Sequence, residues 1–344
     1  MRTMSGGGAP SRGTRRAAFI SAAALGVAVT PGLAGSAQAA PTFKAASNGS
    51  TIHSYKWLNS YTFDFTVQSK ALASRQNVRV LIPKGWQFYS NQSWPVVYAY
   101  HGGADNYLSW TRSTSIETLA NRYGVMVVMP EGGTNGSYTN WYNSGRGGNP
   151  QWETFHLDEV RELVERNYHA GSARATLGIS SGAQGACTYP GRRPGSIRYA
   201  TCLSGVLSMQ APGVPLLLWY TNLGGDFNPD DIWGPWPWAK RNWDAHDPIK
   251  LLPRMRTTKF YISAGTTGKQ GPLDAASKAP WDIGYLSEPP IGRTVQDFAA
   301  EARRQGISVE ANVYGNGSHS WPYWRRELNV AWPKMMAAIG ARQM

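Results

Sequence analysis

Short apolar runs rich in β-branched residues recur along most of the chain. They predict buried strands, because a strand that is covered on both faces is apolar on both. The predicted strands are Val78–Ile82, Val96–Tyr100, Val125–Met129, Ala175–Ile179, Tyr199–Leu203, Lys259–Ser263 and Val309–Tyr314. A further run, Phe63–Val67, is joined to the first of these by a short polar link, which predicts an antiparallel start.

Amphipathic stretches separate these runs and predict helices at Ser115–Tyr123, Leu157–Tyr168, Thr294–Gln305 and Arg325–Arg342. In the second of them Val160, Leu163 and Val164 fall on one face, with charged residues outside it. Strands that alternate with helices predict an α/β fold, in which a mostly parallel central sheet is flanked by helices.

Composition narrows the class of protein. The chain has 344 residues, of which 42% are hydrophobic and 16% charged, so it can bury a large core and is neither disordered nor fibrous. The net charge of +13 is spread along the chain without a block of like charges, so we expect no nucleic-acid partner. The segment Asn222–Pro248 is rich in Trp and Pro, which predicts an ordered insertion and not a linker. We expect no large lid domain.

Residues 1–39 have the pattern of an export signal. Arg12, Arg15 and Arg16 precede the apolar run Ala17–Val29, and Ala37-Gln38-Ala39 matches a signal-peptidase site. The Arg15-Arg16 pair indicates a twin-arginine signal. A membrane anchor is the alternative, but the run is short and rich in Ala and Gly. We therefore expect cleavage, a secreted protein of one domain over residues 40–344, and possible attraction of its basic surface to an anionic cell envelope.

The segment Gly178-Ile179-Ser180-Ser181-Gly182 follows a predicted strand and precedes small residues. In this context G-x-S-x-G indicates a nucleophile elbow, in which a sharp turn exposes the serine hydroxyl above the sheet. Ser180 is the predicted nucleophile. Ser181 is its rival, but we expect the backbone N–H of Ser181 to matter and not its hydroxyl. An ordinary strand-to-helix turn is the alternative interpretation.

A second glycine-rich turn, His101-Gly102-Gly103, follows the strand Val96–Tyr100. This is the place where an α/β-hydrolase supplies its other oxyanion donor. The backbone N–H groups of Gly103 and Ser181 are therefore the predicted oxyanion hole. A simple glycine turn would give the same sequence.

Of the six histidines, only His319 lies in a loop between the last predicted strand and the last helix, where a general base is expected. The order serine, acid, histidine leaves several acids open, and the candidates near loops are Asp226, Asp230, Asp231, Asp274, Asp282 and Glu288. No motif for a metal or a nucleotide is present, so no cofactor is implied.

Several further segments occur in an order that is specific to one family. They are Met129-Pro130-Glu131-Gly132-Gly133, Tyr138-Thr139-Asn140-Trp141-Tyr142, Trp152-Glu153-Thr154-Phe155, Leu203-Ser204-Gly205, Ile232-Trp233-Gly234-Pro235, Ala239-Lys240-Arg241-Asn242 and Ser320-Trp321-Pro322-Tyr323-Trp324. With these, the chain resembles the antigen 85 mycolyltransferases, within the esterase D-like α/β-hydrolases.

The resemblance implies a single α/β-hydrolase domain and a secreted acyltransferase that acts on the cell envelope. It matches the family's serine to Ser180 and its histidine to His319. The family's acid is a Glu shortly before an R-T-x-Q-x-F segment, which here is Arg293-Thr294-Val295-Gln296-Asp297-Phe298. The resemblance therefore implies that Glu288 is the acid.

This chain departs from the family at the oxyanion loop. The family has an aspartate there, followed by arginine-containing sequence that helps to bind trehalose, whereas this chain has His101-Gly102-Gly103-Ala104-Asp105. The backbone donor is kept and the sugar-binding side chains are not. Pro190 and Pro194 also predict a shortened or kinked helix after the elbow.

Three functions follow from these residues. The first is a serine acyltransferase or esterase that acts on acyl esters of lipids or sugars, with a lipid, sugar or water hydroxyl as acceptor. The second is a simple carboxylesterase, and the third is a non-catalytic envelope or matrix-binding protein. His101, Trp233 and Trp321 are candidate substrate contacts, with core packing as the alternative for the rings. Cys187 and Cys202 form either a disulfide or two buried thiols.

Overall fold

The computed structural model describes residues 42–135, 137–223, 225–277 and 283–344. Phe43–Met344 forms one compact unit. The predicted export signal at 1–39 and the candidate acid Asp282 lie outside the described residues and stay predictions.

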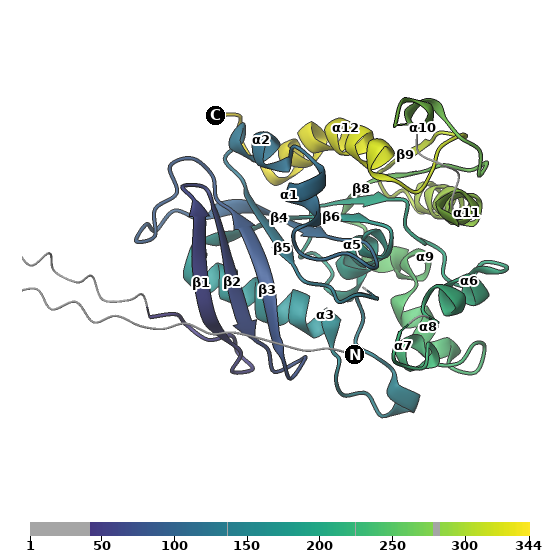
Figure 1. The fold of residues 1–344 in the computed structure, drawn as a ribbon, viewed down its shortest axis with the longest axis horizontal. Coiled ribbons are helices and arrows are strands. Elements are labelled where there is room, and N and C mark those ends of the chain that lie inside the picture. The colour runs from purple at the N-terminus through teal and green to yellow at the C-terminus, as the bar shows by residue number, and fades with distance from the viewer. Residues whose placement is uncertain (1–41, 136, 224, 278–282) are drawn as a thin grey trace, which may run out of the picture. The chain divides into compact units, whose positions relative to one another are not determined.

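Within the described residues a nine-stranded sheet runs in the order β1-β2-β3-β5-β4-β6-β7-β8-β9 (Figure 1). Its strands are β1 Thr51–Asn59, β2 Thr62–Gln68, β3 Arg75–Leu81, β4 Trp94–Tyr100, β5 Met126–Pro130, β6 Ala170–Ile179, β7 Tyr199–Leu203, β8 Lys259–Ala264 and β9 Val309–Val313. From β5 to β9 all neighbours pair in parallel, whereas β1, β2, β3 and β5 pair antiparallel.

The predicted fold class is confirmed, and each predicted apolar run is a strand of this sheet. The predicted antiparallel start is β2 against β3. Strand β1 was not predicted, because most of its residues are exposed, and Trp57 and Leu58 are about two-fifths exposed. An edge strand of this kind lacks the continuous apolar run that marks a buried strand.

The helices of the described residues are α1 Ser109–Ser113, α2 Ile116–Asn121, α3 Trp152–Thr154, α4 Arg161–Tyr168, α5 Ser181–Arg192, α6 Val214–Thr221, α7 Asp230–Trp233, α8 Lys240–His246, α9 Pro248–Leu251, α10 Pro272–Ser277, α11 Ile283–Arg304 and α12 Trp321–Ile339. Two short 3₁₀ turns, η1 Asn143–Gly145 and η3 Leu252–Arg254, and one π turn, η2 Phe155–Val160, complete them.

Two apolar clusters cover the two faces of the sheet. One contains buried side chains of α4, α5 and α11, including Leu163 and Phe298, and the other contains those of α1, α2 and α12, including Trp110 and Leu328. Burial of this apolar area on both faces is the main force that holds the layers together.

Two predicted helices begin differently from the observed ones. The stretch 157–168 begins as the π turn η2 before α4, and α11 begins at Ile283, before the predicted Thr294. The elbow helix α5 contains Pro190 and ends at Arg192, as the prolines predict. The insertion Asn222–Pro248 folds into α7 and α8, in which Trp233 and Trp243 are buried, and no large lid is formed in this part of the chain.

Cys187 on α5 and Cys202 on β7 form a disulfide. The sequence left a disulfide and two free thiols open, and the structure has the disulfide. It ties the helix that follows Ser180 to the neighbouring strand.

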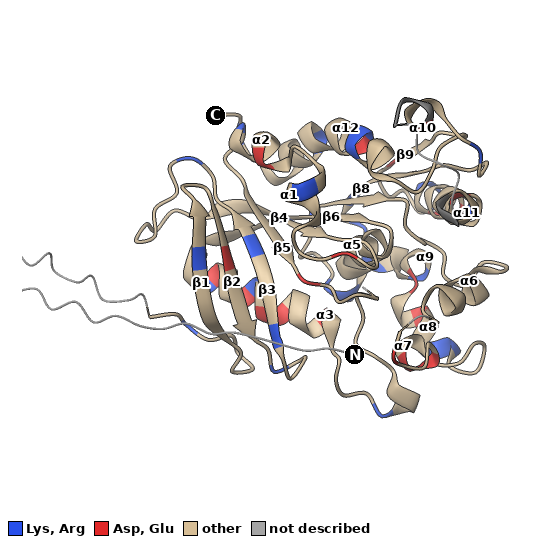
Figure 2. Ribbon diagram, viewed as in Figure 1, with Lys and Arg blue, Asp and Glu red and all other residues tan. Residues whose placement is uncertain are grey.

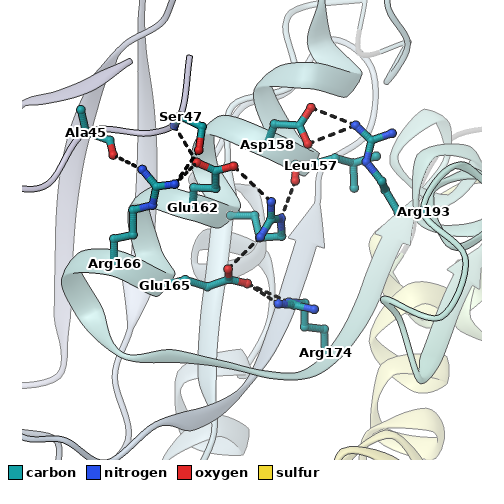
Figure 3. Close-up of polar contacts among 10 residues, drawn as sticks. Ala45, Ser47, Leu157, Asp158, Glu162, Glu165, Arg166, Arg174 and Arg193 are labelled. Carbon is teal, nitrogen blue, oxygen red and sulfur yellow. Dashed lines mark hydrogen bonds and ion pairs between the residues drawn. The ribbon is translucent and has the colours of Figure 1, made fainter. Parts of the chain in front are cut away.

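Charged residues of both signs are scattered over the elements (Figure 2). Where they meet, they form paired networks, as on α4, where Glu165 accepts from Arg161 at 2.8 Å and from Arg174 of β6 at 2.5 Å (Figure 3). Arg166 reaches the backbone oxygen of Ala45 and so holds the start of the described chain against α4. Such partly exposed pairs contribute little stability one by one and fix geometry together. None of the described helices has the length and apolar character needed to cross a bilayer.

Candidate active site

Ser180 lies at the sharp turn from β6 into α5, with φ 53° and ψ −124°. Two glycines make this turn possible. A Cβ on Gly178 would lie 2.1 Å from the backbone oxygen of Gly182, and one on Gly182 would lie 2.3 Å from the backbone oxygen of His101. The G-x-S-x-G spacing is therefore a packing requirement between the elbow and the loop after β4.

The imidazole of His319 stands directly over this serine. Its Nε2 lies 2.8 Å from Ser180 Oγ. His319 lies in the loop between β9 and α12, and the ring of Trp324 contacts the imidazole edge-to-face at 5.0 Å between centroids. The sequence had placed a general base in this loop, and the structure brings it within hydrogen-bond distance of the predicted nucleophile.

Glu288 supports the other side of the imidazole. Its Oε1 lies 2.6 Å from His319 Nδ1, and its Oε2 accepts a hydrogen bond of 2.6 Å from the backbone N–H of Gly265. The carboxyl group is fully buried in α11, and Gly265 follows β8 directly. A buried carboxylate with two defined donors can orient an imidazole and stabilise its positive charge.

The rival acids lie elsewhere in the described chain. Asp274 is buried, but its carboxylate accepts from Ser318 Oγ and, at 2.9 Å, from Tyr323 Oη. Asp226, Asp230 and Asp231 lie in the insertion, at or near α7. Glu288 is therefore the acid that contacts His319, whereas Asp274 contacts Ser318, the residue before His319.

The two residues that carry the predicted oxyanion donors, Gly103 and Ser181, lie close together. A Cβ built on Gly103 would lie 3.9 Å from Ser181 Oγ. Ser181 is the first residue of α5, where a backbone N–H has no acceptor within the helix. In the described part of the chain the Gly103 N–H also has no acceptor, whereas the next N–H, that of Ala104, donates to Thr134 O at 2.5 Å. Both groups are thus available to a developing oxyanion.

The His101 side chain is buried, and its role as a substrate contact stays a prediction. The residue is 1% exposed, and its Nδ1 lies 2.7 Å from Gly102 O. Its Nε2 lies 2.8 Å from Gly132 N and 3.1 Å from Glu131 Oε1. Burial raises the pKa of Glu131, but hydrogen bonds from His101 and from backbone N–H groups outweigh it, so that the pKa lies below its usual range. His101 thus holds the oxyanion loop against the loop after β5.

The two predicted tryptophans also pack within the fold. Trp233 is 4% exposed and contacts the ring of Trp243, and its role as a substrate contact stays a prediction. Trp321 packs edge-to-face on Trp110 and Trp324, at 5.5 and 5.2 Å between centroids. The ring that contacts His319 is that of Trp324, which the sequence did not single out.

Sequence reasoning also missed a buried polar cluster behind the elbow. His156, in the π turn η2, has Nδ1 2.8 Å from Tyr189 Oη and Nε2 2.8 Å from Glu131 O. Its ring stacks on that of Tyr138. Burial lowers the pKa of His156 to about 3. No sequence signal marks this cluster, because its members come from four separate segments. Among the described residues no group of His, Cys, Asp and Glu side chains is arranged to hold a metal ion.

Comparison with known proteins gives the family. The family described as "Putative esterase" matches residues 69–335. Diacylglycerol acyltransferase/mycolyltransferase Ag85C of Mycobacterium avium is 29% identical over 243 residues, which are 68% of this chain and 67% of the relative. Ag85A of Mycobacterium tuberculosis is 28% identical over 261 residues, 72% of this chain and 74% of the relative.

Solved structures share the fold. MPT51 (FbpC1) of Mycobacterium tuberculosis has a TM-score of 0.63 at 21% identity, over 79% of this chain and 96% of its own. The serine hydrolase FphF of Staphylococcus aureus has a TM-score of 0.60 at 21% identity, over 80% and 97%. The family match and these relatives agree with the elbow and the sheet: the chain belongs to the esterase family, as an antigen 85-like α/β-hydrolase of the esterase and acyltransferase class.

Proposed function

We propose that this protein is a serine-dependent acyltransferase and esterase that carries its acyl group on Ser180. The observation that carries the proposal is the continuous hydrogen-bond relay of 2.8 Å from Ser180 Oγ to His319 Nε2 and 2.6 Å from His319 Nδ1 to Glu288 Oε1. A serine hydroxyl is a weak nucleophile by itself and is activated by such an oriented base.

In the first half of the proposed reaction His319 Nε2 takes the proton of Ser180 Oγ as this oxygen attacks the ester carbonyl of the donor. The Gly103 and Ser181 N–H groups stabilise the resulting oxyanion, and Glu288 stabilises the imidazolium. His319 then gives its proton to the leaving alcohol oxygen, the carbon–oxygen bond breaks, and the acyl group remains on Ser180. Each oxyanion donor of this kind lowers the barrier by about 3 kcal/mol.

In the second half an acceptor hydroxyl gives its proton to His319 Nε2 and attacks the acyl-enzyme. Collapse of the intermediate returns that proton to Ser180 Oγ and releases either a new ester or, with water, a free acid. The relay serves both outcomes equally, so the acceptor is decided by which hydroxyl reaches the acyl carbon and by the exclusion of water.

Lipid and sugar acyl esters are the proposed donors. The relatives named diacylglycerol acyltransferase/mycolyltransferase support this substrate class. A carboxylesterase that uses only water is the alternative, and the complete relay argues against a non-catalytic binding protein. We place the activity outside the cell, because the 1–39 segment has an export pattern and a buried disulfide is typical of oxidising compartments.

Ser180→Ala tests the proposal. The variant should stay folded and lose turnover of short p-nitrophenyl esters to about a thousandth of wild type or less. Ser181→Ala is the matched control, since it removes the rival hydroxyl and keeps the backbone N–H. More than about a tenth of the activity left in Ser180→Ala would place the nucleophile elsewhere. Mass spectrometry of products from an acyl-donor panel with glycerides, sugars or water then identifies the acceptor.

A further inference from the structure

Helix α6, Val214–Thr221, is apolar on both of its sides. Val214 and Leu218 face the core and are buried. Three outward residues of the helix and one that follows it are also apolar or aromatic: Leu216 is 70% exposed, Tyr220 66%, Trp219 40% and, after the helix, Leu223 45%. Thr221 is exposed too, but its hydroxyl donates to Leu218 O. We call the four apolar or aromatic residues the outer face of α6. A surface helix normally presents polar side chains on its outward side, so this face is unusual for a helix in contact with water.

The surroundings of α6 also lack charge. From residue 205 to residue 225 the sequence contains no Lys, Arg, Asp or Glu. Figure 2 shows α6 without a blue or red segment, whereas its neighbours α8 and α9 carry charges. The only polar side-chain atoms on the outer face are the indole N–H of Trp219 and the phenol hydroxyl of Tyr220.

This composition fits a lipid surface better than a protein partner. Protein interfaces carry about one hydrogen bond per 100–200 Å² and have a polar rim. The outer face of α6 has only two polar side-chain atoms and no charged group. The acyl region of a lipid layer offers no hydrogen-bonding or charged groups, so an apolar face needs none to bind it. Leucines enter its acyl region, and Trp and Tyr rings lie at the boundary with water, where their single polar atom stays hydrated.

Hydrogen bonds connect the residue that follows α6, and the segment that precedes the helix, to elements of the candidate active site. The Asn135 amide donates to Asn222 Oδ1 at 3.4 Å, just after α6, and Asn135 follows Thr134, whose oxygen accepts from Ala104 N. Ala104 is the residue after the proposed oxyanion donor Gly103. Before α6, Leu207 N donates to Thr294 Oγ1 at 3.1 Å, which lies on α11, the helix that carries Glu288.

We infer that the outer face of α6 docks the enzyme on a layer of neutral acyl lipid and so presents the acyl donor to Ser180. The delivery of an acyl donor to Ser180 rests on the proposed function, whereas the binding of lipid by α6 does not. The link from Asn222 through Asn135 and Thr134 connects the end of α6 with the loop that carries the proposed oxyanion donor Gly103. In the view of Figure 1, α6 lies at the periphery of the molecule, away from the central sheet.

Co-sedimentation with phosphatidylcholine vesicles that contain diacylglycerol tests the inference. The wild-type protein should bind, and a Leu216→Ser/Tyr220→Ser/Leu223→Ser variant should bind at least about tenfold more weakly. Tyr89→Ser is the matched control, because Tyr89 is 76% exposed in the loop between β3 and β4, and it should bind as wild type. Both variants should hydrolyse a water-soluble short ester within about twofold of wild type, because exposed substitutions leave the fold intact.

Vesicle binding by Ser180→Ala separates the inference from the proposed function. This variant should bind vesicles as wild type does, whatever its activity. The inference is overturned if the α6 variant binds as tightly as wild type. It is also overturned if binding needs anionic phosphatidylglycerol, disappears at high salt and ignores the α6 substitutions, since net charge would then be the cause. A dimer in sedimentation velocity that the α6 variant dissociates, without vesicle binding, would assign the face to a second copy of the chain.

Discussion

At the scale of single residues, the elbow holds Ser180 in a conformation that side-chain-bearing residues avoid. Its φ of 53° and ψ of −124° cost about 1–3 kcal/mol relative to relaxed backbone. Hydrogen bonds on both sides maintain it: Ser180 N donates to Leu203 O at 2.9 Å, and Ala183 N donates to Ser180 O at 3.0 Å. The sheet and α5 thus force the hydroxyl toward His319, where it is needed for the proposed attack.

Replacement of Glu288 by Gln keeps the size of the side chain and tests whether its carboxylate orients the His319 imidazole. The two Glu288 oxygens face two N–H donors, His319 Nδ1 and Gly265 N, and an amide can offer its oxygen to only one of them. Either a buried N–H loses its acceptor or the imidazole takes the wrong tautomer. We expect kcat on a short ester to fall by about a thousandfold with little change in KM. Circular dichroism controls for folding, and a fall of less than about tenfold would remove Glu288 from the relay.

His156 should make the protein sensitive to mild acid. Burial lowers its folded pKa to about 3, against about 6.5 in the unfolded chain. Between these values the unfolded state binds more protons, so the contribution of His156 is complete above about pH 6.5 and is lost as the pH falls toward 3. The loss amounts to about 1.4 kcal/mol per pH unit.

Urea unfolding of wild type and His156→Gln near neutrality and near pH 5 measures this effect. The variant should be less stable near neutrality, because it disturbs a buried hydrogen-bonded ring, and its stability should depend less on pH. His246 and Asp247, whose pKa values burial also shifts, occur in both proteins and cancel in the difference. Equal pH dependence in the two proteins would show that His156 is not the neutral buried group described above.

Residue identities were predictable where chain order and local spacing carry the information. The Gly spacing marked Ser180, and the loop between the last strand and helix marked His319. The acid came from the family resemblance, since spacing left six candidates open. The burial of His101 and Trp233 was not predictable, because an unaligned sequence does not distinguish a ring that lines a site from one that packs behind it.

At the scale of elements, the parallel strands were predictable because they are buried on both faces and read as continuous apolar runs. The edge strand β1 and the π turn η2 were not, since the first is exposed and the second depends on how His156 and Glu159 are satisfied. Glu159 is fully buried and accepts hydrogen bonds from Ser50, Ser69 and the backbone of Ala71. Those partners lie about ninety residues or more away in sequence, which no local pattern reveals.

The loop that carries His319 is held by α10 through Asp274. Its carboxylate accepts from Ser318 Oγ, from Tyr323 Oη at 2.9 Å and from Gly271 N at 3.0 Å. Ser318 directly precedes His319, and Tyr323 lies at the start of α12. Asp274 is therefore a positioning residue: it acts on the reaction by holding the two ends of this loop.

Asp274→Asn places an amide N–H₂ against one of these donors and should loosen the loop. We expect kcat to fall by about ten- to a hundredfold with KM nearly unchanged, because a small misplacement of a catalytic group is costly. The unfolding free energy should fall by about 1–3 kcal/mol. Asp226→Asn is the control, since Asp226 was an equal candidate from sequence and is exposed. A loss of stability with unchanged kcat would make Asp274 structural only.

At the scale of the whole molecule, the sheet brings segments that are far apart in sequence to one edge. Ser180 follows β6, Gly265 follows β8, His319 follows β9, and Gly103 follows β4. Parallel strands place their carboxyl ends on the same side, which is why the hydrogen-bonded residues Ser180 and His319 and the proposed oxyanion donors lie at that edge. This convergence follows from the fold class and was predictable from it, whereas the acceptor depends on side chains around the mouth of the site.

Those side chains argue against trehalose as the preferred acceptor. The resemblance to the antigen 85 family implies that charged residues of the oxyanion loop help to bind this sugar in that family. Here His101 is buried, and Asp105 and Arg112 pair with each other at 2.6 Å. A site that has lost its partners for sugar hydroxyls loses discrimination between hydroxyl acceptors. In an acyl-donor assay with added trehalose, we expect free acid and esters of simple alcohols to compete with any trehalose ester, as read by mass spectrometry. Glucose and glycerol at equal hydroxyl concentration are the controls. Trehalose esters as the dominant product would contradict this expectation and would assign sugar binding to other residues, with the insertion Asn222–Pro248 first among them.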